Sequence, residues 1–317
     1  MLGAILGERS QVGAQRLLLC RPQGGLNDML CQIERSCRYA ERFDRTVVVE
    51  ADCRSTHNFK DSLAKYFVSQ QARLVLDAAE IRGRLDTLEV YPHVLRGRVN
   101  GYEARFDAQA NYIDAQTGQR LSFDLDRDYD EPLLVHHQSG GGQLSLGALA
   151  RMRLHEDVVD LLLARLRITG PAYSSIHIRN TDLRTDYQRH VRQWADELKG
   201  PIFVATDNRE TLAECRRLLG EHRVHAFARL PAQPGRPLHY TDEFADRFPT
   251  NADSILDLVM LGLATDFRGI GVEPNAFGIK YSGFSMLAAN LQNAKPILAR
   301  LIARRDPVLD AMLWPFE

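Results

Sequence analysis

Strands and helices alternate regularly in the second half of the chain, and this alternation restricts the possible folds more than any other feature of the sequence. Apolar, strand-like runs at residues 173–178 and 201–206 are each followed by a helical pattern, over residues 187–198 and 210–219. Parallel strands need a crossover connection, most often a helix, so this alternation indicates a parallel sheet. We therefore predict an α/β fold with a doubly wound parallel sheet.

The first half of the chain begins with a unit of the same kind. An apolar run at residues 16–20 precedes a glycine-rich turn at residues 22–28, and a helical pattern follows. The β-branched run at residues 46–50 is typical of a buried parallel strand and completes the unit. Residues 102–130 are polar and aromatic instead, and we interpret them as a hairpin with its turn at residues 116–118.

The length of the chain, 317 residues, suits two domains of about 150 residues, each large enough for its own hydrophobic core. The sequence thus predicts two Rossmann-like, doubly wound lobes, residues 1–160 and residues 161–317, which face a central cleft. Ligands of open α/β sheets bind at the carboxyl ends of the strands, so this cleft is the expected ligand site.

Charge balance and cysteine content limit the partners and the compartment. Lys and Arg number 40 and Asp and Glu number 41, so no basic field would attract nucleic acid or an anionic membrane. The 5 cysteines lack C-x-x-C spacing, which argues against a disulfide framework and a structural zinc site. Residues 1–15 lack the apolar core of a signal peptide, and no run approaches the roughly 18 apolar residues of a transmembrane helix. We expect a cytoplasmic protein without a transmembrane segment.

Residues with chemical capacity lie at the ends of two predicted strands. His177 is near the end of the first strand, Arg179 follows it and Asp182 completes the turn. An Arg at such a strand end is well suited to hold a phosphate group. The alternative is an ordinary ion pair of Arg179 and Asp182 on the surface. Thr206 and Asp207 end the next strand in the same way.

The glycine turn near the start of the chain is a second candidate. Gly24 and Gly25 would let backbone N–H groups approach a phosphate or a sugar, and Asn27 and Asp28 follow at the start of a helix. The patterns G-x-G-x-x-G and G-x-x-x-x-G-K-[ST] are absent, which argues against NAD binding and ordinary nucleotide hydrolysis. The alternative is a tight turn with a polar helix cap.

Two further groups of polar residues lie toward the C-terminus. Asp257 stands in the apolar helical run at residues 253–264, where a buried carboxylate needs a partner such as Arg179 or an N–H group of a ligand. Ser282 and Ser285 lie at the start of a helix, whose N-terminus could bind an anion.

Two other features lack the pattern of a metal site. The acidic run at residues 124–130 has Tyr129 where a calcium loop needs Gly, so we interpret it as a solvated loop. His136 and His137 are adjacent, and on a strand they would point to opposite faces. We therefore expect no metal ion.

Five motifs lie in order along the chain, at residues 24–28, 177–182, 203–207, 255–257 and 282–285, with Ala288 after the last. In this order they resemble the fucosyltransferase superfamily, which includes the nodulation fucosyltransferases, the core α-1,6-fucosyltransferases and the protein O-fucosyltransferases. The resemblance covers most of residues 171–292 and the first strand and helix. It implies a two-lobed GT-B glycosyltransferase that inverts the anomeric carbon, needs no metal or other cofactor, and binds the sugar nucleotide in the C-terminal lobe and the acceptor on the N-terminal side.

The resemblance also implies roles for single residues. Arg179 would hold the β-phosphate and stabilise the charge that develops as GDP leaves. Asp257 would read the N–H groups of guanine, and His177 would line the donor site. Ser285 would contact the diphosphate, and Asp182 would brace the turn. The other expected donor-site residues are Gly24, Gly25, Asn27, Thr206, Asp207 and Ser282.

The catalytic base stays open at this point. Some members of the superfamily have a Lys and a Glu where this chain has Leu183 and Tyr187, and others have a Glu where this chain has Gly24. Asp28 and Asp186 are the remaining candidates. Either would have to come within hydrogen-bond reach of the acceptor hydroxyl.

The resemblance implies transfer of fucose or a related sugar from a GDP-sugar to a hydroxyl of a glycan, such as an intermediate of polysaccharide biosynthesis. The region at residues 102–142 would then shape acceptor choice. A transferase for another nucleotide sugar is an alternative, because Arg179 would recognise the diphosphate and not the base. Leu183 and Tyr187 leave a non-catalytic nucleotide- or glycan-binding homologue open. A Rossmann-like scaffold protein without a ligand site is a further alternative, and it would require Arg179 and Asp257 to be only a structural pair.

Overall fold

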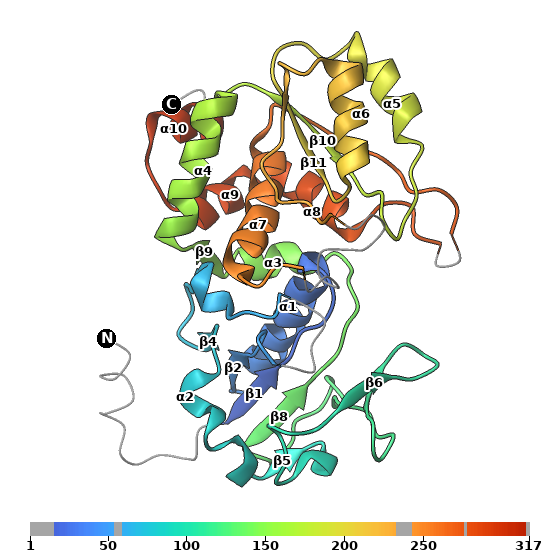
Figure 1. Cartoon of the computed structure of the whole chain (residues 1–317). Helices are drawn as coiled ribbons and strands as arrows, with labels where there is room; N and C mark the ends of the chain where they lie inside the picture. Colours follow the sequence, from blue (N-terminus) through green and yellow to red (C-terminus); the bar gives the residue numbers. More distant parts are fainter. Residues whose placement is uncertain (1–15, 54–58, 233–242, 276–277, 315–317) are drawn as a thin grey trace.

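The structure, a computed structural model, describes residues 16–53, 59–232, 243–275 and 278–314. These residues form two lobes, each built on a parallel sheet, with the N-terminal lobe below the C-terminal lobe in Figure 1. No helix in these ranges is long and apolar enough to cross a membrane. Residues 1–15, which carry the prediction about a signal peptide, lie outside the described residues.

The sheet of the N-terminal lobe has five parallel strands in the order β4-β2-β1-β8-β5. These are β1 (Leu17–Cys20), β2 (Thr46–Val49), β4 (Leu74–Val75), β5 (Val90–Tyr91) and β8 (Leu133–His136). Leu18 and Cys20 join the core on the side of helix α1 (Leu26–Arg42), whereas Leu17 and Leu19 join a second core on the opposite face. Strand β1 is wholly apolar because both of its faces are buried.

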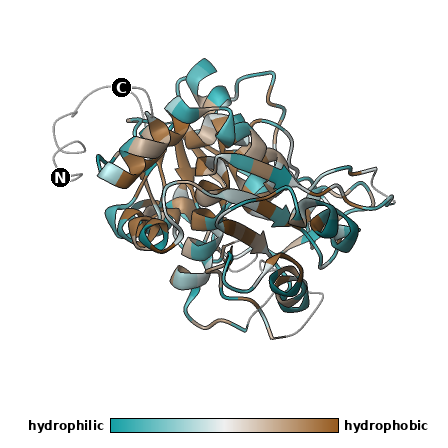
Figure 2. Cartoon of the chain, turned by 90° about the horizontal axis from the view of Figure 1, so that it is seen from above, coloured by the Kyte–Doolittle hydropathy of each residue, from teal (hydrophilic) through white to brown (hydrophobic). Residues whose placement is uncertain are grey.

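The sheet of the C-terminal lobe has four parallel strands in the order β12-β11-β10-β13. These are β10 (Ser174–Ile178), β11 (Ile202–Thr206), β12 (Val224–His225) and β13 (Asp266–Gly269). The surrounding helices are α5 (Tyr187–Ala195), α6 (Arg209–Leu219), α7 (Arg247–Leu263) and α8 (Gly283–Gln292). Ile202 and Val204 pack on the side of α5 and α6, while Phe203 and Ala205 pack on the side of α7 and α8. Helices therefore cover both faces, and Figure 2 shows apolar strands enclosed by helices with hydrophilic outer faces. The predicted α/β fold is confirmed.

The two lobes share one hydrophobic core, which includes Leu18 and Leu30 from the first and Leu256 and Leu309 from the second. Helix α8 packs against α1 and α3, α4 packs against α7 and α10, and α9 contacts β9, which pairs with β3. The bounds are α3 (Ser145–Leu149), α4 (Glu156–Thr169), α9 (Lys295–Ile302), α10 (Pro307–Leu313), β3 (Phe67–Ser69) and β9 (Met152–Leu154). Residues 160 and 161 both lie inside α4, and the division of the chain between them stays a prediction.

The predicted turn at residues 116–118 is present: the N–H group of Leu121 donates to the carbonyl of Tyr112 at 3.0 Å, and that of Asp114 donates to the carbonyl of Gln119 at 2.8 Å. The longer pairing of this segment is with a strand that was not predicted. Strand β7 (Tyr112–Asp114) is antiparallel to β6 (Ala104–Phe106), whereas Arg120 contributes a single bridge to β7. Oδ1 of Asp107 accepts two backbone N–H groups of the loop between β6 and β7, at 2.9 and 2.7 Å. An Asp that bonds to the backbone two residues later closes a turn, so this side chain explains the observed register. Four short elements complete the lobe: α2 (Ala79–Arg82), η2 (Leu63–Lys65), η3 (Leu85–Thr87) and η4 (His93–Leu95).

Helix α7 begins at Arg247, well before the predicted start at residue 253. The side chain of Asp246 caps it by accepting the N–H group of Phe248 at 3.0 Å. Pro249 is tolerated in the first turn because the N–H groups there have no partner within a helix. The first two turns of α7 are therefore helical although they are polar.

Candidate active site

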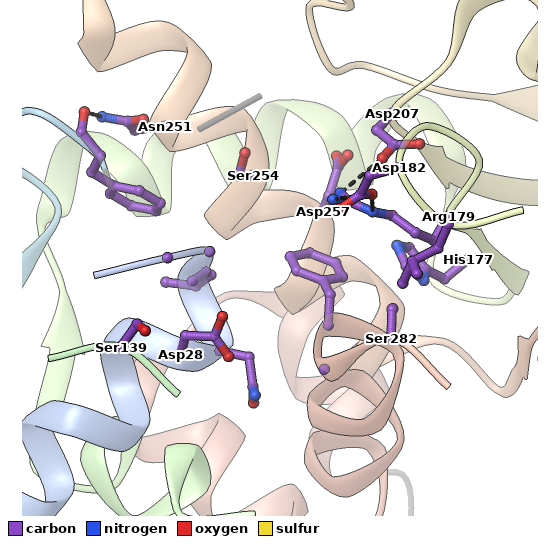
Figure 3. Close-up of a pocket in the computed structure, with 18 of the residues that line it drawn as sticks. Asp28, Ser139, His177, Arg179, Asp182, Asp207, Asn251, Ser254, Asp257 and Ser282 are labelled. Carbon is purple, nitrogen blue, oxygen red and sulfur yellow. Dashed lines mark hydrogen bonds and ion pairs between the residues drawn. The ribbon is translucent and has the colours of Figure 1, made fainter. Parts of the chain in front are cut away.

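A cavity of about 610 Å³ lies between the two lobes, within the range of small-molecule sites. The N-terminal lobe contributes the glycine turn, the start of α1, the hairpin and the loop after β8. The C-terminal lobe contributes the ends of β10 and β11, one face of α7 and the start of α8 (Figure 3). The predicted site residues that line the cavity are Gly24, Gly25, Asn27, Asp28, His177, Arg179, Asp182, Thr206, Asp207, Asp257 and Ser282.

Arg179 follows β10, and its guanidinium lies between two carboxylates (Figure 3). Nε and Nη2 lie 2.8 and 2.7 Å from Oδ1 of Asp182, and Nη1 lies 2.7 Å from Oδ2 of Asp207. The side chain of Asp182 is 46% exposed, whereas that of Asp207 is 8% exposed. Solvent screens the pair with Asp182 more strongly, so this pair is the weaker one. The edge of Arg179 formed by Nε and Nη2 is therefore the edge that an anionic ligand can take over.

The turn that carries Arg179 is held by the end of β11. Oδ1 of Asp207 accepts the backbone N–H group of Asn180 at 3.0 Å, and Oδ2 accepts the hydroxyl of Thr181 at 2.7 Å. The side chain of Asn180 donates to Oγ1 of Thr211 on α6 at 2.9 Å. Asp207 thus organises the turn with both oxygens, and Arg179 is oriented before any ligand binds.

Next to this turn, His177 is packed against the start of α8. Its Nδ1 shares a hydrogen bond of 2.5 Å with Oγ of Ser285, and its ring lies 5.0 Å from that of Phe284. Burial lowers the pKa of His177 to about 4, so the imidazole is neutral near pH 7. Ser282 caps α8 by accepting the N–H group of Ser285 at 3.1 Å and donates to its Oγ at 3.1 Å. Ser285 is buried and is not among the residues that line the cavity; it supports His177 and Ser282.

On the opposite wall, Asn27 and Asp28 project from the first turn of α1 and are enclosed by glycines. A Cβ atom on Gly24 would lie 2.7 Å from Oδ2 of Asp28, and one on Gly141 would collide with the same carboxylate. A Cβ atom on Gly283, in the C-terminal lobe, would lie 2.7 Å from Nδ2 of Asn27. Gly24 also has a φ of 92°, which favours glycine. A side chain at Gly141 or Gly283 would therefore force the end of Asp28 or Asn27 to shift.

The two candidate bases differ in position. Asp28 lines the cavity, and burial raises the pKa of its carboxyl, while the Asn27 side chain, the Gly25 amide and the charge of Arg179 oppose the rise. A raised pKa makes a carboxylate a better proton acceptor. Asp186 is exposed at the start of α5 and is not among the cavity-lining residues. Of the two, Asp28 is the one that faces the cavity.

Asp257 pairs with Arg165 of α4, so the prediction of Arg179 as its protein partner is wrong. Nη1 of Arg165 donates to Oδ1 of Asp257 at 3.2 Å, and Nη2 donates to Asp253 one helical turn earlier. Burial raises the pKa of Asp257 to about 7; Arg165 opposes the rise and the charge of Asp253 adds to it. Arg165 lies 92 residues from Asp257 in the sequence, so the pair has no local signal.

Two hydroxyl groups at the cavity wall have no hydrogen-bond partner among the described residues. They are Oγ1 of Thr206 at the end of β11 and Oγ1 of Thr250 on α7, and both atoms are buried. Buried polar atoms of folded proteins are nearly always paired.

Comparison with known proteins identifies the fold of the chain. No protein-family model and no curated protein sequence matches the chain. The structure of a NodZ alpha-1,6-fucosyltransferase co-crystallized with GDP is similar, with 16% identity, a TM-score of 0.56, and coverage of 88% of this chain and 93% of that chain. Fucosyltransferase NodZ from Bradyrhizobium has 15% identity, a TM-score of 0.53, and coverage of 88% and 94%. The apo form of POFUT1 has 12% identity, a TM-score of 0.53, and coverage of 91% and 98%.

The chain has the GT-B fold of these fucosyltransferases. The predicted GT-B architecture is therefore confirmed. It also accounts for the position of the cavity, because the carboxyl ends of β10 and β11 and the start of α1 meet between the lobes.

Several residues that line this GT-B cleft were not predicted as site residues, although Leu26, Ala205, Gly283 and Phe284 lie inside the five motifs. Those not predicted are Leu26, Phe59, Phe106, Tyr112, Ser139, Gly140, Leu183, Ala205, Arg247, Thr250, Asn251, Ser254, Ile279, Gly283 and Phe284. A signal exists for part of this set. Arg247, Thr250, Ser254 and Asp257 recur every three or four residues, so they form one polar face of α7 along the cavity.

The features that lacked a metal pattern have structural partners. Among the described residues, no group of three or more His, Cys, Asp and Glu side chains could hold a metal ion. His136 shares hydrogen bonds of 2.7 Å with both Gln32 and Ser122, and burial lowers its pKa to about 3. Gln32 in turn donates to the carbonyl of Ser139 at 2.9 Å. This buried network therefore supports the loop that borders the cavity.

Proposed function

We propose that this chain is a glycosyltransferase that moves fucose from GDP-fucose to a hydroxyl group of a glycan. The observation that carries the proposal is a cavity between two lobes with Arg179 on one wall and Asp28 on the opposite wall (Figure 3). Solved structures of the same fold include NodZ co-crystallized with GDP and NodZ soaked with GDP-fucose, which supports a GDP-sugar as donor.

In the proposed donor complex, the β-phosphate binds the edge of Arg179 that Asp182 now occupies. The ion pair between Asp207 and Nη1 of Arg179 remains. A bidentate contact between Arg and phosphate is strong and directional. When the bond between the anomeric carbon and the phosphate oxygen breaks, that phosphate gains negative charge. Arg179 and the N-terminus of α8, which Ser282 caps, stabilise this charge, so the proposed reaction needs no metal ion.

Asp28 is the proposed general base. The acceptor hydroxyl transfers its proton to the Asp28 carboxylate as its oxygen bonds to the anomeric carbon, and GDP leaves from the opposite face of the sugar. A single displacement of this kind inverts the anomeric configuration. The location of Asp28 and Arg179 on different lobes supports this geometry, because it separates the proton acceptor from the leaving group.

The base of the nucleotide would contact Asp257, whose carboxylate can accept N–H groups of guanine. A transferase for another nucleotide sugar is the second candidate, because Arg179 and Ser282 offer contacts suited to phosphate in general. The proposed setting is a cytoplasmic step of polysaccharide or oligosaccharide biosynthesis. None of the 5 cysteines forms a disulfide, which is consistent with a reducing compartment.

Calorimetric titration with GDP, UDP and CDP tests the donor. We expect GDP to bind more tightly than the two pyrimidine nucleotides. Tight binding of UDP without binding of GDP would exclude the fucosyl assignment. Release of GDP from GDP-fucose then separates an enzyme from a non-catalytic homologue: release should occur with the wild-type protein and be lost in Arg179→Ala.

A further inference from the structure

An exposed aromatic side chain at the cavity wall has no part in the donor site described above. Phe106, the last residue of β6, is 45% exposed and lines the cavity. Strands β6 and β7 form a two-stranded sheet of their own, which projects from the N-terminal lobe in Figure 1. Phe106 belongs to none of the core clusters formed by the described residues. Its position therefore does not serve the packing of either lobe.

Phe106 rests on a column of rings that is fixed to the lobe. Its ring centroid lies 4.1 Å from that of Tyr112, which in turn stacks on His137 at 4.8 Å. The hydroxyl of Tyr102 and Nδ1 of His137 share a hydrogen bond of 2.6 Å. The side chain of Gln138 holds the backbone of Tyr112 through bonds of 3.0 and 2.9 Å. These contacts hold the support under Phe106 in place, so a ligand that binds the open side of the ring costs little conformational entropy of the protein.

The opposite lobe offers a second exposed apolar side chain to the same cavity. Ile279 is 39% exposed and lies in the loop before α8. Asn275 holds it by accepting its N–H group at 3.2 Å and donating to its carbonyl at 2.8 Å. The other exposed large hydrophobic residues of the described chain, Leu161, Ile168 and Tyr281, are not among the lining residues. The exposed apolar surface at the cavity therefore comes from both lobes.

The chemistry of this wall fits a sugar ring. A pyranose has an apolar face of C–H groups and a polar edge of hydroxyls, and the negative face of an aromatic ring attracts such weakly positive hydrogens. Ser139 and Asp28 lie on the same lobe as Phe106 and offer polar atoms for the edge of the ring (Figure 3). We infer that Phe106 is the stacking platform for a pyranose ring of the acceptor glycan, with Ile279 bordering the same subsite. This inference rests on the proposed function.

The acceptor, and not the donor, is the sugar in question. The groups suited to the donor, Arg179, Asp257 and Ser282, all belong to the C-terminal lobe. Phe106 belongs to the same lobe as Asp28, the proposed base. A ring on Phe106 therefore lies on the side from which the acceptor hydroxyl approaches.

The test uses the whole protein, saturated with GDP, on a printed array of bacterial and plant oligosaccharides. Four variants are compared with the wild type: Phe106→Ala, Phe106→Trp, Ile279→Ser, and Ile168→Ala as a matched control on α4, away from the cavity. We expect Phe106→Ala to lower glycan retention by about tenfold, in line with the loss of one aromatic contact. Phe106→Trp and Ile168→Ala should retain glycan as well as the wild type does, and Ile279→Ser should lower glycan retention by a smaller factor than Phe106→Ala.

The affinity for GDP, measured by calorimetry, separates the possible outcomes. Unchanged GDP affinity with reduced glycan retention in Phe106→Ala supports the inference. Equal retention in Phe106→Ala and wild type would overturn it, and so would the absence of any retained glycan while GDP still binds. Failure of the wild type to bind GDP would reject the proposed function itself. Thermal unfolding checks that each variant is folded. If Phe106→Ala is unfolded, the glycan retention of Ile279→Ser tests the inference instead.

Discussion

The two walls of the cavity are built by different means. The C-terminal wall orients Arg179 and His177 through ion pairs and hydrogen bonds that exist before any ligand binds. The N-terminal wall orients Asp28 by the close approach of glycine backbones, among them Gly24 and Gly141. A wall of paired charges suits a diphosphate, whereas a sterically enclosed carboxylate suits the transfer of one proton at one place. Changes in charge should therefore act on the first wall, and changes in volume on the second.

The largest effect is expected from Asp28, the proposed base on the N-terminal wall. Asp28→Asn should lower turnover by about 10² to 10⁴-fold, because the amide cannot accept the acceptor proton. GDP affinity should stay the same, since Asp28 lies on the N-terminal wall, the proposed acceptor side. Turnover is measured as acceptor-dependent GDP release. Asp186→Asn is the control and should behave as wild type; the reverse pattern would assign the base to Asp186.

Arg179→Ala should lower turnover by about 10² to 10³-fold, because in the proposed mechanism it removes the cation that stabilises the leaving phosphate. Unlike Asp28→Asn, it should also weaken GDP binding, measured by calorimetry. Arg179→Lys keeps the charge but loses the bidentate edge, so it should fall between Ala and wild type. If Arg179→Ala binds GDP and turns over normally, Arg179 is only a structural partner of Asp182 and Asp207.

A change of volume on the N-terminal wall should act through Asp28. The added methyl group of Gly141→Ala collides with the Asp28 carboxylate, which must move. We expect turnover to fall by up to about 10²-fold, because a misplacement of about 1 Å can cost that much, with little change in GDP affinity. Gly83→Ala is the matched control, because a Cβ atom there meets no atom within 4 Å. Equal activity of the two variants would show that the glycine enclosure does not position the base.

The smallest effect concerns pH. The pKa of Asp257 is raised to about 7, so this carboxyl gains a proton as the pH falls below that value and can then accept fewer N–H groups of guanine. GDP affinity should decrease on acidification by at most about tenfold per pH unit. His177, with a pKa of about 4, does not titrate in this range. Calorimetry across neutral pH compares the wild type with Asp257→Asn. The terminal phosphate of GDP also titrates near pH 6, so the expected signal is the part of the pH dependence that the variant loses. The same pH dependence of GDP affinity in the wild type and in Asp257→Asn would contradict the proposed guanine contact.

Local features were predictable and contacts between distant segments were not. The buried strand β11 and the pairing of Arg179 with Asp182 depend on neighbouring residues, and both follow from the sequence pattern. The partner of Asp257 is Arg165 on another helix, and no residue near Asp257 indicates it. The early start of α7 was missed because polar residues occupy a helix face that only the cavity explains.

The sequence by itself determined the α/β architecture and the turns that carry Gly24 and Arg179, because apolar periodicity and the backbone freedom of glycine act over a few residues. Only the tertiary structure decided that Asp28 and not Asp186 faces the cavity, and that Arg165 is the partner of Asp257. Both outcomes depend on burial and on distances between residues far apart in the chain. These quantities exist only once the two lobes have packed together.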